Sequence, residues 1–199
     1  MKLLLPQLTW EIKTGKKEVF ITFDDGPHPS ITPAVMDILE DYKARATFFC
    51  VGQNVERYPE IYGQILKRGH KTGNHTFNHM NGWKVSREAY FANVDKCAEI
   101  VDSHLFRPPY GRIGLYHIPR LKMNYRIIMW SVLSRDFDSR VSPGQCLENS
   151  IKYTRPGSII IFHDSEKSSK NMLYALPRFL EHLKSKGYSF PALTSDRIV

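Results

Sequence analysis

The stretch "VFITFDDGPHPS", residues 19–30, places two adjacent carboxylates directly after a run of strand-forming residues. Residues 19–23 are β-branched or aromatic and fit a pleated surface that is covered on its faces, so they predict a buried strand. Asp24 and Asp25 then fall at its carboxyl end. Neighbouring side chains there point in roughly opposite directions, and two partly desolvated carboxylates need a partner such as a bound cation. The alternative is a Gly-Pro turn in which both acids face water.

Length and composition indicate one soluble domain covering residues 1–199. The chain is 42% hydrophobic, which is ordinary for a globular protein, and it is long enough to bury a substantial core. No stretch is long and apolar enough to predict stable membrane insertion. Residues 1–17 lack a signal-peptide core and a cleavage site, so the sequence predicts a cytoplasmic protein. The oligomeric state is left open.

The charge balance permits a polyanionic partner without indicating one. There are 28 Lys and Arg against 20 Asp and Glu, a formal net charge of +8. The densest basic clusters, "KTGKK" (13–17) and "EKSSK" (166–170), lie in predicted loops and lack interleaved aromatic residues. We therefore expect no nucleic-acid partner. Cys50, Cys97 and Cys146 are odd in number and far apart, which predicts reduced core residues.

Apolar runs alternate with segments of helical periodicity along the rest of the chain. Besides 19–23, strands are predicted at 46–52, 126–133, 157–164 and 188–193, and helices after a capping Ser30 and at 55–70, 86–101, 117–124, 143–153 and 170–186. This alternation predicts repeated βα units and a mainly parallel sheet, open or closed into a barrel. Sites in such folds gather at the carboxyl ends of strands, where Asp24, Asp25, Asp136, His163 and Asp164 all fall.

His75 and His79 stand four residues apart in "HTFNH". In a helix or a tight turn both imidazoles project to one side and can bind one metal ion, although most isolated pairs of this kind bind none. An acid from a separate strand end changes that balance. Two histidines and one aspartate leave coordination positions open for water and substrate, as is typical of a catalytic zinc site.

Four motifs together resemble the NodB-homology polysaccharide deacetylases, carbohydrate esterase family 4: "TFDDGP", "HTFNH", "RPPYG" and "FHD", in this order. The resemblance spans about residues 18–190. It implies an α/β fold, a distorted (β/α) barrel of the NodB/glycoside hydrolase-deacetylase type. It also implies a metal-dependent hydrolase that removes N-acetyl groups from an N-acetylated sugar or polysaccharide, similar to peptidoglycan or chitin, by attack of a metal-bound water.

The resemblance also implies residue roles. Asp25, His75 and His79 match the metal ligands, with Zn²⁺ the first choice and Co²⁺ or Ni²⁺ acceptable to the same donors. Asp24 matches the general base, because a free carboxylate beside the ion can complete the deprotonation of its water. Arg107 matches the arginine that holds this base ionised and oriented.

The remaining motif residues match groups that contact or protonate the substrate. Tyr110 would donate its backbone N–H to the oxyanion, in a loop stiffened by Pro108 and its neighbour. His163 matches the general acid that protonates the departing amine, and Asp136 matches the carboxylate that raises the pKa of this histidine. The residues expected to form the wall around the acetyl group and the sugar are Ile161, Phe137, Pro108 and Tyr110; Phe137 stands where the family often has tryptophan.

Two alternatives stay open at this point. The same site could hydrolyse acetyl esters, formamides or cyclic amides, or the chain could be a non-enzymatic protein that binds carbohydrate or polyanions. Asp138 is a weaker candidate than Asp136 for the partner of the acid. The histidines that match no motif are expected to be structural: His70, His104, His117 and His182. His28 is expected at most to touch substrate.

Overall fold

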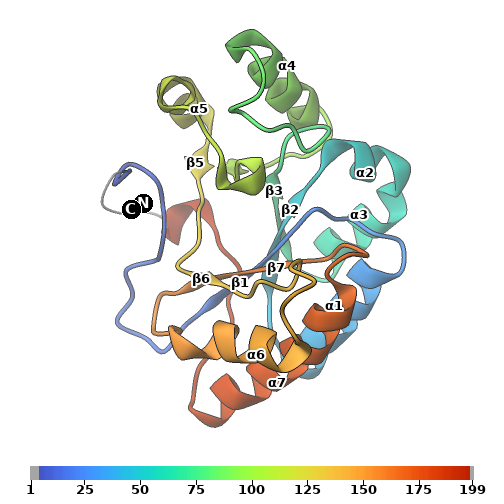
Figure 1. Cartoon of the computed structure of the whole chain (residues 1–199), viewed down its shortest axis with the longest axis vertical. Coiled ribbons are helices and arrows are strands. Elements are labelled where there is room, and N and C mark those ends of the chain that lie inside the picture. Colours follow the sequence, from blue (N-terminus) through green and yellow to red (C-terminus); the bar gives the residue numbers. More distant parts are fainter. Residues whose placement is uncertain (1–4, 198–199) are drawn as a thin grey trace.

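The opening stretch forms β1, Phe20–Asp24, an interior strand of a parallel sheet (Figure 1). The computed structural model describes residues 5–197, and within them seven strands pair in the order β5-β4-β3-β2-β1-β7-β6. All of these pairs are parallel. The other strands are β2 Ala46–Cys50, β3 Lys71–Asn74, β4 Leu105–Phe106, β5 Arg126–Ile127, β6 Val132–Leu133 and β7 Ile159–His163.

The two edge strands of this sheet, β5 and β6, are almost adjacent in sequence. Residues 128–131 alone connect them, and such a link spans at most about 18 Å. The sheet therefore curls until its edges approach each other, and it forms an incomplete barrel. The predicted (β/α) barrel with irregular closure is confirmed.

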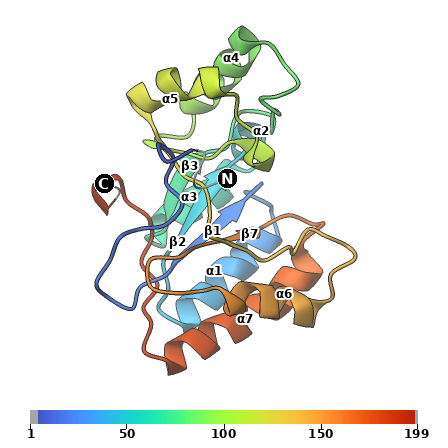
Figure 2. The same cartoon turned by 60° about the vertical axis from the view of Figure 1, so that its left-hand side comes forward.

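Helices cover the outside of the curled sheet. They are α1 Ile31–Asp41, α2 Gly52–Arg57, α3 Pro59–Lys67, α4 Arg87–Ala98, α5 Ile118–Asn124, α6 Pro143–Lys152 and α7 Ser169–Ser185, with short 3₁₀ turns η1 Pro109–Gly111, η2 Leu115–His117 and η3 Ser195–Arg197. Figures 1 and 2 both show α1, α6 and α7 at one end of the molecule and α4 and α5 at the opposite end. None of the helices between residues 5 and 197 has the length and apolar character needed to traverse a lipid bilayer.

Alternation along β1 separates the outer core from the barrel interior. Ile21 and Phe23 belong to the large apolar cluster shared with α1 and α7, and the Phe23 ring stacks on that of Phe48 at 5.0 Å between centroids. Phe20 belongs to a smaller interior cluster, and Thr22 and Asp24 follow it on the same face of the strand. The first acid of the pair therefore points into the barrel.

Several element predictions are corrected by the structure. The predicted helix 55–70 is two helices that meet at Tyr58, because the residue before Pro59 is driven out of helical geometry. The predicted strand 126–133 is two short strands, and 188–193 forms no named strand but an isolated bridge from Ser189 to Glu18. The strands β3 and β4 were not predicted.

The cap of α1 also differs from the prediction. The Ser30 side chain makes no capping hydrogen bond. Instead the Nδ1 atom of His28 accepts from the backbone N–H groups of Ser30 and Ile31, at 3.3 Å each. His28 therefore has a structural role at this helix start. The prediction for Cys50, Cys97 and Cys146 is confirmed, since all three are free and buried.

Candidate active site

Most of the predicted site residues line one cavity of about 530 Å³ at the carboxyl edge of the sheet. β1 and β7 lie side by side there, with Asp24 and His163 in register. The residues that line the cavity are Asp24, Asp25, His75, His79, Tyr110, Gly111, Trp130, Leu133, Phe137, Ile161, His163, Ser165 and Lys167. Three predicted site residues are absent from this lining, and all three are buried: Arg107, Pro108 and Asp136.

Asp25, His75 and His79 form a cluster suited to one metal ion. One ligand atom from each lies within 4.8 Å of the others. The Oδ1 atom of Asp25 is 3.2 Å from Nε2 of His79 and 3.8 Å from Nε2 of His75. Asp25 and His79 both adopt left-handed backbone conformations, with φ of 82° and 58°. Such strained positions concentrate at functional sites, and here they turn two side chains toward the third.

Each histidine of the cluster is held through its Nδ1 atom. His75 donates its Nδ1–H to the carbonyl of Arg107 at 2.7 Å, which leaves Nε2 as the free lone pair facing Asp25. Burial lowers the pKa of His75 to about 4 against the attraction of Asp24, so this imidazole is neutral at neutral pH. The Nδ1 atom of His79 lies 3.1 Å from the Tyr110 hydroxyl, which orients the second ring.

The Asp25 carboxylate stays ionised in these surroundings. Burial acts to raise its pKa, but the hydrogen bond with His79 and the electrostatic attraction of the neighbouring histidines, that of His163 first, outweigh burial and hold the pKa well below its usual range. An ionised acid and a neutral imidazole are the protonation states that a metal site requires. The donor chemistry of the cluster therefore fits a divalent ion.

Asp24 lies beside this cluster but is paired elsewhere. Its Oδ1 atom accepts a hydrogen bond of 2.7 Å from Arg107, and its Oδ2 atom is 3.7 Å from Nε2 of His75. Arg107 is fully buried, and its guanidinium also donates to Thr22 and to the carbonyls of Ile128 and Met129. A buried charge pair is tolerated only when its remaining polar atoms are satisfied, as they are here.

His163 and Asp136 form the second pair. His163 donates its Nδ1–H to Oδ1 of Asp136 at 2.8 Å, and its backbone N–H donates to Oδ2 at 2.7 Å. Burial acts to lower the pKa of His163, but the charge and hydrogen bond of Asp136 prevail and raise the pKa to about 9. Asp138 instead pairs with Arg135 and Arg140, away from His163, in agreement with its lower rank as a candidate.

Tyr110 is positioned by both its main chain and its side chain. Its φ of 61° turns the loop that follows Pro108. Its hydroxyl contacts His79, and the two rings lie 4.4 Å apart.

Asp164 is a structural partner of the site whose role was missed. It is buried and accepts hydrogen bonds from the Gly26 N–H at 3.0 Å and from the Thr32 hydroxyl at 2.5 Å, so it fixes the turn that carries Asp25. A side chain at Gly26 would not fit, because its Cβ would lie 2.1 Å from Oδ2 of Asp164. Burial raises the pKa of Asp164 to about 7. Its adjacency to His163 in "FHD" was the available signal.

A comparison with known families decides the assignment. The model described as polysaccharide deacetylase matches residues 11–124. The chain belongs to the polysaccharide deacetylase family. This confirms the resemblance to carbohydrate esterase family 4 and makes the protein a hydrolase of that family.

Individual relatives of this polysaccharide deacetylase agree with the family assignment. A peptidoglycan-N-acetylglucosamine deacetylase of Bacillus cereus is 37% identical over 191 residues, covering 92% of this chain and 89% of the relative. A chitooligosaccharide deacetylase of Azorhizobium caulinodans is 38% identical over 164 residues, 77% and 76% of the two chains.

A solved structure confirms the fold. The Bc1960 peptidoglycan N-acetylglucosamine deacetylase, in complex with an N-hydroxybenzamide, superposes with a TM-score of 0.90 at 32% identity, covering 97% of this chain and 94% of that one. The deacetylase fold thus extends well beyond the residues that the family model matches.

Proposed function

We propose that this polysaccharide deacetylase removes the acetyl group from an N-acetylated sugar of the peptidoglycan or chitin type. One observation carries the proposal. Asp24 and His163, the candidate base and acid, are register partners on β1 and β7, and they border the same cavity as the cluster of Asp25, His75 and His79. A general base, a set of metal ligands and a general acid around one cavity are the groups that metal-assisted amide hydrolysis requires.

Asp25, His75 and His79 would hold the divalent ion, for which Zn²⁺ is our first choice. Nitrogen and oxygen donors also accept Co²⁺ and Ni²⁺. When bound, such an ion lowers the pKa of a water molecule and polarises a carbonyl oxygen.

Asp24 would act as the general base. Its carboxylate accepts a proton from the attacking water, while the hydrogen bond from Arg107 fixes the direction of the carboxylate. The water oxygen forms a bond to the acetyl carbon, and negative charge develops on the carbonyl oxygen. The backbone N–H of Tyr110 would donate to this oxyanion.

His163 would act as the general acid. Its raised pKa keeps the ring protonated at neutral pH, so that Nε2 can deliver a proton to the sugar nitrogen as the C–N bond breaks. Acetate and a free amine result. Ile161 and Phe137 line the same cavity and would enclose the acetyl methyl group.

A protonated acid favours an amide over an ester as the substrate. An amine is a poor leaving group without a proton, whereas an alkoxide from an ester depends less on one. The test measures hydrolysis of acetamido sugars by the metal-loaded protein, as acetate release, beside that of acetyl esters (acetate), formamides (formate) and cyclic amides (ring opening) at equal concentration. Acetate release that requires the metal and disappears in His163→Ala supports the proposal. Turnover of the other substrates alone would overturn it.

A further inference from the structure

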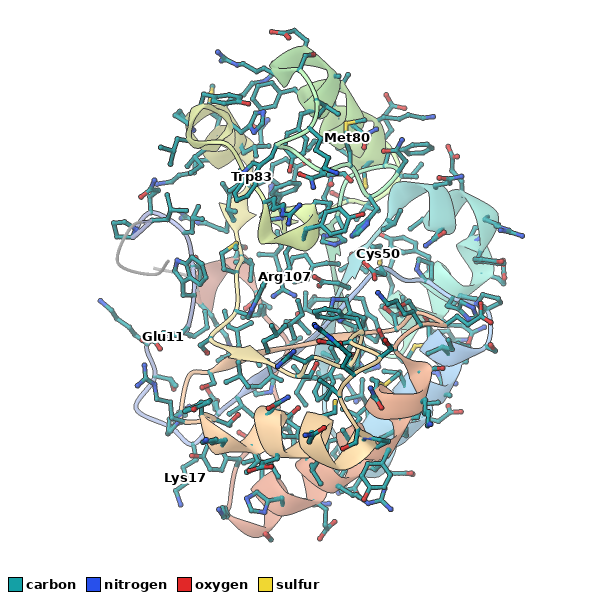
Figure 3. All side chains as sticks on the ribbon, in the orientation of Figure 1. Glu11, Lys17, Cys50, Met80, Trp83 and Arg107 are labelled. Atoms are coloured by element: carbon teal, nitrogen blue, oxygen red, sulfur yellow. The ribbon has the colours of Figure 1, made fainter. Side chains whose placement is uncertain are left out.

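A second cavity, here called the basal cavity, lies at the amino edge of the sheet. It has a volume of about 730 Å³, within the range of sites for small organic ligands, and it is bordered by α1, α3 and the segments that lead into β2 and β3. His70 at this cavity and His75 at the metal cluster flank β3, so about 16 Å of strand separate them. Figure 3 labels Cys50 at the carboxyl end of β2, and Arg45 precedes the opposite end of that strand. The basal cavity is therefore a different site from the one that carries the metal cluster.

His70 presents an N–H donor to the basal cavity. Only 3% of the residue is exposed, and its Nδ1 atom accepts from the Ala46 backbone N–H at 3.2 Å, which places the ring proton on Nε2. Burial, with the nearby charges of Arg45 and Arg68, lowers the pKa of His70 to about 4, so the ring is neutral at neutral pH. No group between residues 5 and 197 accepts a hydrogen bond from this Nε2–H. A largely buried donor of this kind favours a ligand that supplies an acceptor.

Two cations at the basal cavity lack an anionic partner. Arg45 and Lys67 both line it, and in the described part of the chain neither forms a salt bridge. The Arg45 guanidinium is held in place, because Nη1 donates to the Ala44 carbonyl at 3.1 Å and the side chain packs on Gly69, where a Cβ would lie 3.1 Å from Nε. Guanidinium and ammonium groups are the common protein ligands of phosphate.

The basal cavity also contains groups that bind hydroxyls. Glu40 lines it, and its Oε2 atom is 3.5 Å from Nη1 of Arg68, a cation that lies closer to Asp37, at 2.5 Å. The Glu40 carboxylate therefore keeps lone pairs for further donors, and the amide of Gln64 supplies another acceptor and two donors. With the two unpaired cations, Arg68 makes three against two acids. The surroundings of the basal cavity thus carry an excess of one positive charge.

We propose that the basal cavity binds the phosphate ester of a small polyol or sugar. Arg45, Lys67 and the Nε2–H of His70 donate to the phosphate oxygens. Glu40 and Gln64 bind the hydroxyl groups. A carboxylate fits less well, because the three donors come from three separate segments and a tetrahedral group presents oxygens in more directions than a planar one. A free phosphate ester and a unit of a polyol phosphate polymer share this chemistry, and binding of either does not depend on the proposed deacetylase activity.

The test is calorimetric titration of the unmutated protein with glycerol 3-phosphate at constant ionic strength, first metal-loaded and then after removal of the metal with a chelator and dialysis. The two affinities are equal, because the ligand does not contact the metal cluster. Proton–nitrogen correlation spectra of the imidazoles report the place of binding: the resonances of His70 move when the ligand is added, and those of His75 stay. Binding that requires the metal, or shifts confined to His75, overturns the proposal.

Arg45→Gln and Lys67→Gln each remove one charge without leaving a buried gap, since both side chains are exposed. Each weakens binding of glycerol 3-phosphate by about tenfold. Lys71→Gln is the matched control, because Lys71 is exposed, follows His70 directly and lies outside the lining of the basal cavity. Its affinity stays unchanged. An equal loss of affinity in Lys71→Gln would mean attraction to the general positive charge of the protein, and it overturns the site.

Three further compounds test the class of ligand. Glycerol does not bind, and inorganic phosphate binds several-fold more weakly than glycerol 3-phosphate because it lacks the hydroxyl groups that Glu40 and Gln64 contact. Inorganic phosphate that binds as tightly as the ester, or an ester that does not bind, overturns the proposed ligand. The diester glycerophosphoglycerol distinguishes the two sources. An affinity equal to that of the monoester identifies a polymer unit, a weaker one identifies a free phosphate ester, and either result supports the phosphate site.

Discussion

At the scale of single residues, the repulsion between the adjacent carboxylates of Asp24 and Asp25 is relieved because each carboxylate faces a different partner. Asp24 continues the alternation of β1 and points to the buried Arg107. Asp25 has a φ of 82°, and this turn directs its carboxylate to His75 and His79. The acids thus face different partners, and they can serve as base and ligand without exchanging roles.

Asp24→Asn separates those two roles. Asparagine is nearly isosteric with aspartate but cannot take a proton from water, so we expect turnover of an acetamido sugar to fall by at least about 100-fold. Asp25 and both histidines are unchanged, so the bound metal measured by elemental analysis stays the same. Asp37→Asn, an exposed acid paired with Arg68, is the control and keeps its activity. Loss of metal from Asp24→Asn would show that Asp24 is a ligand.

The pH dependence of turnover depends on Asp136. A pKa of about 9 keeps His163 protonated through neutral pH, and protonation is lost as pH rises through that value. Asp136→Asn retains an acceptor for the ring N–H but removes the negative charge. Burial then lowers the pKa of His163. We expect the alkaline limb of the kcat profile to move to lower pH by at least one unit.

Asp138→Asn provides the control for this shift, because Asp138 pairs with Arg135 and Arg140 instead of His163. Its alkaline limb stays in place. An Asp136→Asn profile that superposes on that of the unmutated protein would mean that His163 is not the acid whose titration limits turnover.

At the scale of elements, sequence patterns predicted the structures whose signal is local. β1 consists of β-branched and aromatic residues up to Asp24, β7 is apolar up to His163, and α7 repeats its apolar residues at helical spacing over 17 residues. β3 has the sequence KTGN and β4 only two residues, so neither carries a pattern that distinguishes it from a loop. Their strand geometry comes from pairing with neighbours, which a periodicity argument does not detect.

The site residues also divide into those with a local sequence signal and those that depend on distant contacts. The placement of Asp24, Asp25 and His163 at strand ends followed from the alternation of strands and helices alone. The pairing of Asp24 with Arg107, 83 residues away, was available only from the family resemblance. The role of Asp164 in fixing the turn after β1 was missed because it depends on a hydrogen bond with Gly26, 138 residues away, which no local pattern shows.

The hydrogen bonds of Asp164 to the turn after β1 are expected to support metal binding by Asp25. Asp164→Ala leaves the Gly26 N–H and the Thr32 hydroxyl without their acceptor, and Asp25 loses its fixed direction. We expect metal affinity to fall by about tenfold or more in a competition titration with a chelator, while far-UV circular dichroism stays native. Asp164→Asn retains one acceptor oxygen and recovers part of the affinity. If Asp164→Ala bound the metal with unchanged affinity, the turn would keep its conformation without the Asp164 side chain.

At the scale of the whole molecule, one side chain connects the closing segment of the barrel to the candidate base. Arg107 donates to the carbonyls of Ile128 and Met129, in the segment that joins the two sheet edges, and to Asp24 on β1. The closing segment and the candidate base are therefore held by the same guanidinium. The side chains of Asp25, His75 and His79 lie next to Asp24. We therefore expect that an ion bound by these three side chains stabilises the entire fold.

Metal binding is accordingly expected to raise the thermal stability of the protein. An ion that binds the native state at 100 times its Kd stabilises by about 2.7 kcal/mol, which for a chain of this size raises Tm by about 5–10 °C. A chelator reverses the shift and removes acetate release together. His79→Ala loses one of three ligands and with it most of the shift in calorimetry. His104→Ala, an exposed histidine outside the cavity, keeps the full shift. If metal raised the Tm of His79→Ala as much as that of the unmutated protein, the ion would bind at a different site, because one carboxylate and one imidazole bind it less tightly than three ligands.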